Sequence, residues 1–341
     1  MKSKLKSFGK GVVSVLFVAL ITLLLLEGVL RFFYHNHHLV EKIPGAIKYI
    51  QKLDGSRNIV IQYDPNCAKY DPDLSYILRS EGCVFEGKEF STSYQVNSQG
   101  LRDDENSLSK PEIIVLGDSY GMGWGVEQNE TFANLIEKET GKKTLNAAIS
   151  SYGTARQYLS LKKRDLSKLE YVILQYCIND YGENKHFIEN NFNLEVMDLG
   201  VYEGHVVKGL KKKKKNNKFL RMSSIVIREL IRDIKKPSVE TKAGLAEDNR
   251  MEEFANLALL IDKIKEVKPD AKIILFEAHL GAKTHNDDLF NYFSANKVDN
   301  VAVFDSAKIL NREDYFDIDV HYNASGHYKI SQKITEILSK E

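Results

Sequence analysis

Glu112-Ile113-Ile114-Val115-Leu116-Gly117-Asp118-Ser119-Tyr120 is the stretch that decides the fold. Its first five residues form a short apolar run that ends at a glycine, which is the pattern of a buried strand. Similar patterns predict further strands at 144–149, 171–177, 272–278 and 301–305, and helices at 131–140, 155–166, 251–267 and 325–338. Because strands alternate with helices, we predict an α/β, three-layer, flavodoxin-like fold with a parallel five-stranded sheet.

Reactive side chains follow three of the predicted strands, at the sheet edge where parallel α/β proteins bind ligands. Ser119 follows the first strand, Asn179 follows the third, and the segment after the fifth carries Asp319 and His321. Serine is a weak nucleophile until a base removes its proton, and His321 is the candidate base. Asp319 could orient the imidazole, with Asp317 as the other candidate acid.

The same edge offers hydrogen-bond donors for an oxyanion. The backbone N–H of Ser119 and the side-chain amide of Asn179 are the first candidates. Each motif alone is more often an ordinary turn or a surface residue. Their common placement at strand ends is what favours a serine hydrolase or acyltransferase over chance.

The sequence resembles the SGNH/GDSL hydrolase superfamily, whose signature blocks supply Ser, Gly, Asn and His. The matching segments are 115–119 for block one, 146–154 loosely for block two, 177–180 for block three and 319–323 with Gly326-His327 for block five, preceded by a lead-in at 96–102 that is similar to membrane-anchored bacterial members. The resemblance covers roughly 95–181 and 270–341. It implies a catalytic Ser119, His321 and Asp319, and an oxyanion hole made of Ser119, Ser151 and Asn179.

Three departures from the family pattern stand out. The block-two glycine falls on Ser151, whose backbone N–H can still serve, with Gly153 as the fallback donor. The block-three glycine is Cys177, which narrows the space beside the site. The acid lies two residues before His321, a spacing similar to the alginate O-acetyltransferase branch. Asp118 is expected to have a structural role.

The N-terminus reads as a membrane anchor. Four lysines in the first ten residues precede an apolar stretch at 11–33, which is about long enough to cross a bilayer as a helix. Glu27 and Arg31 are four residues apart and can pair near the interface. A cleaved signal peptide is the rival interpretation, but no small-x-small cleavage site follows Leu26. We therefore expect a single-pass protein with a cytoplasmic N-terminus and an extracytoplasmic catalytic domain.

The expected organisation follows from these segments: a cytoplasmic tail at 1–10, the anchor at 11–33, a linker and N-terminal elaboration at 34–110, and the catalytic domain at 111–341. Residues 182–245 lack a strand–helix rhythm and are interpreted as an insertion. Within them, the run Lys211–Lys215 is expected to be a solvated loop, with anionic polymer or lipid head groups as the minor alternative.

The composition excludes several functional classes. Lys+Arg number 48 and Asp+Glu 47, so the charge gives no reason to expect nucleic acid as a partner. Cys67 and Cys83 form either a disulfide or two free thiols, and Cys177 is expected to be buried. No cofactor is expected. A metal-dependent hydrolase that uses His279, His285, His321 and His327 is remote, because the HExxH type of spacing is missing.

The leading hypothesis is an enzyme that acts on O-acyl esters, most simply O-acetyl groups on an extracytoplasmic glycan. Esterase and O-acetyltransferase would share all the residues named, so the sequence leaves both open. The second hypothesis is a non-catalytic glycan-binding or assembly-scaffold protein on the same fold, which the replaced glycines would suit.

Overall fold

The structure is a computed structural model that describes residues 2–40, 47–55, 59–214, 220–234, 240–279 and 288–340. It contains two compact units, each built from two stretches of chain. We call 1–58 with 210–238 the helical unit, and 59–209 with 239–341 the sheet unit.

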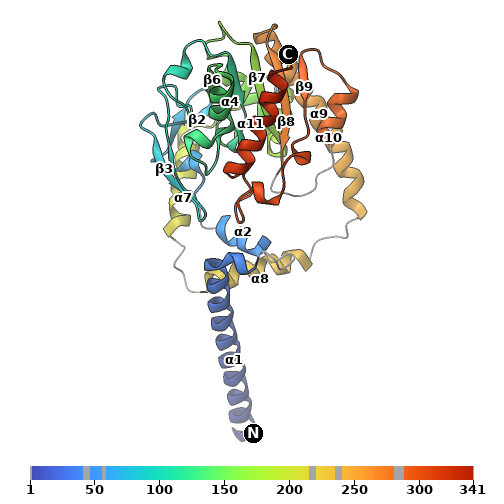
Figure 1. The fold of residues 1–341 in the computed structure, drawn as a ribbon. Helices are drawn as coiled ribbons and strands as arrows, with labels where there is room; N and C mark the ends of the chain where they lie inside the picture. The colour runs from blue at the N-terminus through green and yellow to red at the C-terminus, as the bar shows by residue number, and fades with distance from the viewer. Residues whose placement is uncertain are drawn as a thin grey trace. The chain divides into compact units, whose positions relative to one another are not determined.

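The sheet unit is organised around a parallel sheet (Figure 1). Its five strands are β5 (Ile113–Leu116), β6 (Thr144–Asn146), β7 (Tyr171–Cys177), β8 (Lys272–Ala278) and β9 (Val301–Val303). The strand order is β6-β5-β7-β8-β9 and every pairing is parallel, which is the flavodoxin-like order. The predicted fold class is therefore confirmed. β5, which precedes Ser119, lies between β6 and β7.

Helices cover both faces of this sheet because β5 is apolar on both sides. Ile113 and Val115 pack into one core and Ile114 and Leu116 into another. The first core is closed by α4 (Phe132–Thr140) and α11 (Ala324–Leu338), which lie side by side in Figure 1. The remaining helices of the sheet unit are α3 (Ser119–Met122), α5 (Thr154–Leu161), α6 (Tyr181–Glu189), α9 (Glu240–Val267) and α10 (Asp288–Ala295), with α7 (Leu199–Lys214) reaching its boundary.

Several element boundaries differ from the sequence prediction. β6 ends at Asn146 instead of 149, and α5 ends at Leu161 instead of 166. β9 ends at Val303, because the Asp305 side chain accepts a hydrogen bond from the Ala307 N–H and starts a 3-10 turn. Short 3-10 helices occur at His37–Leu39, Ile61–Tyr63, Asn106–Leu108, Gln128–Glu130, Ile178–Asp180, Ser306–Lys308 and Arg312–Asp314.

The insertion is more regular than expected. Its described residues contain most of α6, all of α7 and α8 (Arg221–Ile234), and the start of α9, which begins at Glu240 instead of the predicted 251. The lysine run was expected to be a loop, but Lys211–Lys214 continue α7, because lysine is a good helix former. Lys215 lies outside the described residues.

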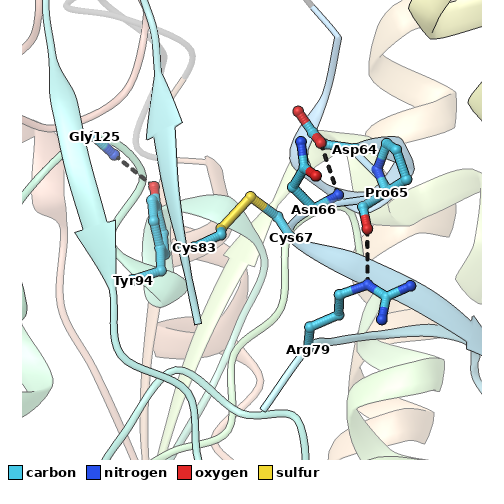
Figure 2. The surroundings of a disulfide bond; sticks show 8 residues. All are labelled: Asp64, Pro65, Asn66, Cys67, Arg79, Cys83, Tyr94 and Gly125. Carbon is cyan, nitrogen blue, oxygen red and sulfur yellow. Dashed lines mark hydrogen bonds between the residues drawn. A yellow bond between two sulfur atoms is a disulfide. The ribbon is translucent and has the colours of Figure 1, made fainter. Parts of the chain in front are cut away.

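The N-terminal part of the sheet unit consists of two antiparallel hairpins. β1 (Ala68–Asp71) pairs with β2 (Ser75–Leu78), and β3 (Cys83–Glu86) pairs with β4 (Ser91–Tyr94). A disulfide between Cys67 and Cys83 ties the two hairpins together (Figure 2). Beside it, the Tyr94 hydroxyl accepts a hydrogen bond from the Gly125 N–H over 3.0 Å. The hairpins are thereby linked to the segment that follows Ser119.

The helical unit contains α1 (Lys2–His35), α2 (Ile47–Gly55) and α8. Residues Gly11–His35 of α1 are long and apolar enough to cross a membrane. The predicted Glu27–Arg31 pair is present, with 3.0 Å between Glu27 Oε1 and an Arg31 guanidinium nitrogen. The unit has its own small core, to which Ile50, Leu53 and Val226 contribute buried side chains.

Candidate active site

The centre of the site is the contact between Ser119 and His321, which are 202 residues apart in the sequence. Ser119 Oγ lies 2.6 Å from His321 Nε2. Ser119 begins α3 directly after β5, and His321 lies in the segment just before α11. The topology therefore brings the two predicted residues within hydrogen-bond distance at the carboxyl edge of the sheet.

The acid beside His321 is Asp319. His321 Nδ1 hydrogen-bonds to Asp319 Oδ1, and the His321 backbone N–H donates to the same oxygen over 3.1 Å. Burial works against ionisation of Asp319, but His321 and the hydrogen bonds around it lower the pKa of this carboxyl below its usual value. Asp317 instead pairs with the Arg312 guanidinium, 3.1 Å away at the surface. Of these two acids, Asp319 is the one that contacts the imidazole.

Trp124 is a member of this cluster that the sequence analysis missed. Its indole N–H donates to Asp319 Oδ2 over 3.1 Å, so each carboxylate oxygen of Asp319 has a donor. The indole ring also stacks on the His321 ring, with 5.0 Å between centroids. Trp124 is the chain's single tryptophan and lies five residues after Ser119, which was the available signal.

Glu89 holds the backbone of the segment that carries Asp319. Its carboxylate accepts hydrogen bonds from three successive N–H groups, those of Asp317, Ile318 and Asp319, over 2.7, 2.8 and 2.7 Å. Burial raises the pKa of Glu89, and the three N–H groups oppose that rise. Glu89 lies between β3 and β4, so the N-terminal hairpins help to shape the site.

A tight turn presents Ser119. Asp118 caps α3 by accepting a hydrogen bond from the Tyr120 N–H over 2.9 Å. Gln175 Oε1, from the neighbouring strand β7, accepts from the N–H groups of Asp118 and Gly121. A Cβ at position 117 would lie 2.5 Å from that same oxygen, so only glycine fits between β5 and β7 there.

Asn179 lies after β7, next to the Ser119 turn. Its amide nitrogen donates one hydrogen to Asp118 Oδ2 over 3.0 Å. The second amide hydrogen stays available, because an asparagine amide carries two donors. Asp118 thus both caps α3 and fixes the Asn179 side chain.

Ser151 lies after β6, on the opposite side of β5 from Asn179. Its φ is +62°, a left-handed conformation that favours glycine. Gln62 supports the loop: its amide nitrogen donates to Ser151 Oγ over 2.9 Å. Gly153, the fallback donor, has another partner: its N–H donates to Glu183 Oε1 over 3.0 Å. Ser119, Ser151 and Asn179 therefore follow three adjacent strands.

Arg102, in the lead-in segment at 96–102, holds the chain segment that follows Ser119. Arg102 is fully buried, lies over the Tyr94 ring and donates hydrogen bonds to the backbone oxygens of Met122, Gly123 and Val126. These carbonyls belong to the segment between Ser119 and α4, which packs on one face of the sheet. Arg102 therefore fixes the path of the chain around Trp124.

The other candidate metal ligands have different surroundings. His327 is buried, and its Nδ1 accepts a hydrogen bond from the Phe132 N–H over 3.2 Å. Burial lowers the pKa of His327 to about 3. His279 is buried next to β8, and His285 lies outside the described residues. Cys177 is a buried free thiol, as predicted, and burial raises its pKa.

No protein-family model matches the sequence, and no curated protein matches it either. Solved structures do match, over about two thirds of this chain. A phospholipase A1 from Streptomyces albidoflavus NA297 is 13% identical, with 67% of this chain and 100% of that chain covered and a TM-score of 0.38.

Two further structures represent other activities. A family 3 carbohydrate esterase from Clostridium thermocellum is 14% identical, covering 67% of this chain and 98% of that chain, with a TM-score of 0.35. A salicylyl-acyltransferase from a tetracycline biosynthetic pathway is 13% identical, covering 68% of this chain and 55% of that chain, with a TM-score of 0.39. These neighbours include both esterases and acyltransferases.

Proposed function

We propose that this chain is a membrane-anchored serine ester hydrolase or O-acyltransferase of the SGNH/GDSL type, acting on O-acyl groups of an extracytoplasmic glycan. The observation that carries the proposal is the chain of contacts from Ser119 Oγ through the His321 ring to Asp319. It couples a hydroxyl nucleophile to a base whose orientation is fixed by a half-buried acid, as acyl transfer through serine requires.

In the first step, Ser119 Oγ attacks the ester carbonyl carbon while its proton moves to His321 Nε2. The imidazolium that forms is stabilised by Asp319, which accepts the hydrogen bond from Nδ1. Collapse of the tetrahedral intermediate breaks the bond to the alcohol, which takes the proton from His321. The product of this half-reaction is an ester between the acyl group and Ser119.

The negative charge on the intermediate requires fixed donors. The Ser119 and Ser151 N–H groups and the second amide hydrogen of Asn179 are the proposed oxyanion hole. Support comes from the strand order, because β6 and β7 flank β5, and Ser151 and Asn179 follow these two strands. Asp118 and Gln62 pre-orient them.

The second half-reaction decides between hydrolysis and transfer. Water or a sugar hydroxyl gives its proton to His321 and attacks the acyl carbon. The bond between the acyl carbon and Ser119 Oγ then breaks, and Oγ takes the proton back from His321. Exclusion of water from the acyl-enzyme separates the two outcomes. An acetyl ester of a glycan is the proposed substrate, by analogy with the polymer-modifying members that the sequence resembles.

Two features support an extracytoplasmic location for the sheet unit. The lysines at 2, 4, 6 and 10 precede the apolar part of α1, so the positive-inside rule leaves the N-terminus in the cytoplasm. The Cys67–Cys83 disulfide fits an oxidising compartment, because such bonds are rare in a reducing cytoplasm.

The test uses a fluorophosphonate probe and turnover of p-nitrophenyl acetate by the purified chain. We expect the wild type to be labelled, and Ser119→Ala to lose labelling and at least about a thousandfold in turnover. Ser109→Ala, at an exposed serine outside the site, is the matched control and should behave as wild type. Turnover that survives in Ser119→Ala overturns the proposal.

A second candidate is a glycan-binding or assembly-scaffold protein without catalysis. It is favoured by the two family glycines that are replaced here, by Ser151 and Cys177. The same probe distinguishes the candidates, since a scaffold would remain unlabelled. The contacts of Ser119, His321 and Asp319 favour the enzyme.

A further inference from the structure

α8 has a two-sided surface that the catalytic proposal does not use. Ile227, Leu230 and Ile231 are spaced i, i+3 and i+4, so they share one face of the helix. They are 37%, 43% and 47% exposed. Arg228 and Arg232, four residues apart, are exposed on another face of the helix. Segregated apolar and cationic faces are typical of helices that lie in a membrane interface.

α8 is fixed to α1 through a charged residue inside the apolar stretch. The Glu27 carboxylate accepts hydrogen bonds from the Ser223 N–H over 2.9 Å and from the Ser223 hydroxyl over 2.8 Å. The Met222 N–H donates to it over 3.4 Å. These are N–H groups of the first turn of α8, which have no partners within their own helix. Glu27 therefore caps the N-terminus of α8. The positive end of the helix dipole lies there and favours a negative charge.

This cap fixes the depth at which α8 begins. Glu27 lies about 24 Å along the helix from Gly11, at about 1.5 Å per residue. A hydrocarbon core is about 30 Å thick, so in an untilted α1 Glu27 would lie about 6 Å from the far boundary. Interfacial helices bury their apolar face by about 5–10 Å at that boundary. α8 therefore starts at the depth that such helices occupy.

The apolar surface of α1 continues to this point. Leu25, Val29 and Phe32, on either side of Glu27 in the sequence, are exposed. Figure 1 shows α8 running across α1 and not along it. Met222 and Val226 are buried, whereas Leu230, one turn further along α8, is exposed.

We infer that α8 is a second membrane contact, an interfacial helix whose Ile227, Leu230 and Ile231 enter the outer leaflet of the bilayer that α1 crosses. Arg228 and Arg232 then face the phosphates of the lipid head groups. The lysine run at 211–215 precedes α8 in the sequence. The inference rests on α1 crossing a bilayer and is independent of the catalytic assignment.

The test places a nitroxide on the full chain in vesicles of phosphatidylcholine and phosphatidylglycerol. Leu230→Cys and Ile227→Cys report the apolar face, and Arg228→Cys is the matched control on the same helix. Val15→Cys, exposed within the apolar part of α1, reports the anchor. The native cysteines do not compete for the label, since Cys177 is buried and the other two are bonded. Labelled wild type measures any background.

The readout is the collision rate of each label with oxygen, which partitions into lipid, and with a water-soluble nickel chelate. We expect oxygen to dominate at Leu230, Ile227 and Val15, and the nickel chelate to dominate at Arg228. Nickel access at Leu230 with oxygen access at Val15 overturns the inference and leaves the anchor standing. Nickel access at both positions overturns the anchor and the inference together.

Two other results would also overturn it. A Leu230 label that neither reagent reaches would be covered by protein. Dipolar broadening that disappears when labelled chains are diluted with unlabelled ones would show that a second copy covers the face. Circular dichroism of each labelled variant reports whether the chain is still folded.

Discussion

The Trp124 indole N–H donates to Asp319 Oδ2 over 3.1 Å, while the same ring stacks on the imidazole that Asp319 orients. One side chain therefore contacts both partners of the proposed acid–base pair. It restrains the carboxylate by a hydrogen bond and the imidazole by packing.

Trp124→Phe keeps a ring for stacking and removes the N–H. A hydrogen bond to a charged group contributes about 1.5–3 kcal/mol, so we expect kcat to fall by about tenfold to a hundredfold with little change in KM. Steady-state kinetics with an acetyl ester measure this. Phe90→Leu, which alters a ring packed on Trp124 and keeps the indole N–H bond, should stay near wild type. An unchanged kcat in Trp124→Phe would remove the residue from the positioning of Asp319.

The two neighbouring acids are expected to behave differently. Asp319→Asn should lower kcat by up to about ten-thousandfold, because an amide at this position favours the wrong imidazole tautomer. Asp317→Asn should have a small effect, since Asp317 pairs with Arg312 at the surface. Parallel measurement of kcat in both variants tests the assignment, which fails if Asp317→Asn is the more damaging change.

Asn179→Ala should lower kcat by about a hundredfold to a thousandfold and leave KM nearly unchanged, because an oxyanion donor acts near the transition state. Asn66→Ala, at an exposed asparagine outside the site, is the control. If only KM changes, then Asn179 binds the substrate in its ground state and does not stabilise the oxyanion.

His327 should make folding sensitive to acid. Burial lowers the pKa of His327 to about 3, from an ordinary value of 6.5. Between pH 6.5 and 3, His327 is therefore protonated in the unfolded chain and neutral in the folded chain. The free energy of unfolding should therefore fall by about 1.4 kcal/mol per pH unit from this residue as the pH drops from 6.5 toward 3. His327→Gln keeps an acceptor for the Phe132 N–H and should show a shallower fall. Urea unfolding at several pH values measures both slopes, and parallel curves would contradict the prediction.

The sequence was sufficient to predict the parallel sheet, because β5, β7 and β8 are short, mainly apolar runs that alternate with helical patterns along the chain. It was also sufficient to propose which side chains meet at the sheet edge, because strand ends in this architecture share one edge. The strand predicted at 144–149 is too long, because β6 ends at Asn146. Residues 147–149 are apolar and buried like strand residues, but they lead into the loop where Ser151 takes a positive φ. The hydrophobic pattern of the sequence does not show where the strand ends and this loop begins.

The supports of the site were not predictable in the same way. Glu89 contacts residues about 230 positions away, and Gln62 contacts a loop about 90 positions away. Neither pairing can be seen in the local spacing of residues, because each depends on how the segment before β5 packs beside the parallel sheet. Glu27 is similar: within the sequence it only interrupts an apolar run, and its role as a cap appears once α8 is placed beside α1.

The division of the chain into units has a consequence for proteolysis. Because 210–238 belong with α1, the chain passes between the units at three places, near 58, 209 and 238. A single cut in the first connection leaves the sheet unit covalently joined to α8, which Glu27 still holds to α1 by hydrogen bonds. Shedding the sheet unit from a membrane would require that this non-covalent joint also come apart. A sheet unit attached in this way would stay bound after a cut that would release a domain joined to its anchor by a single linker.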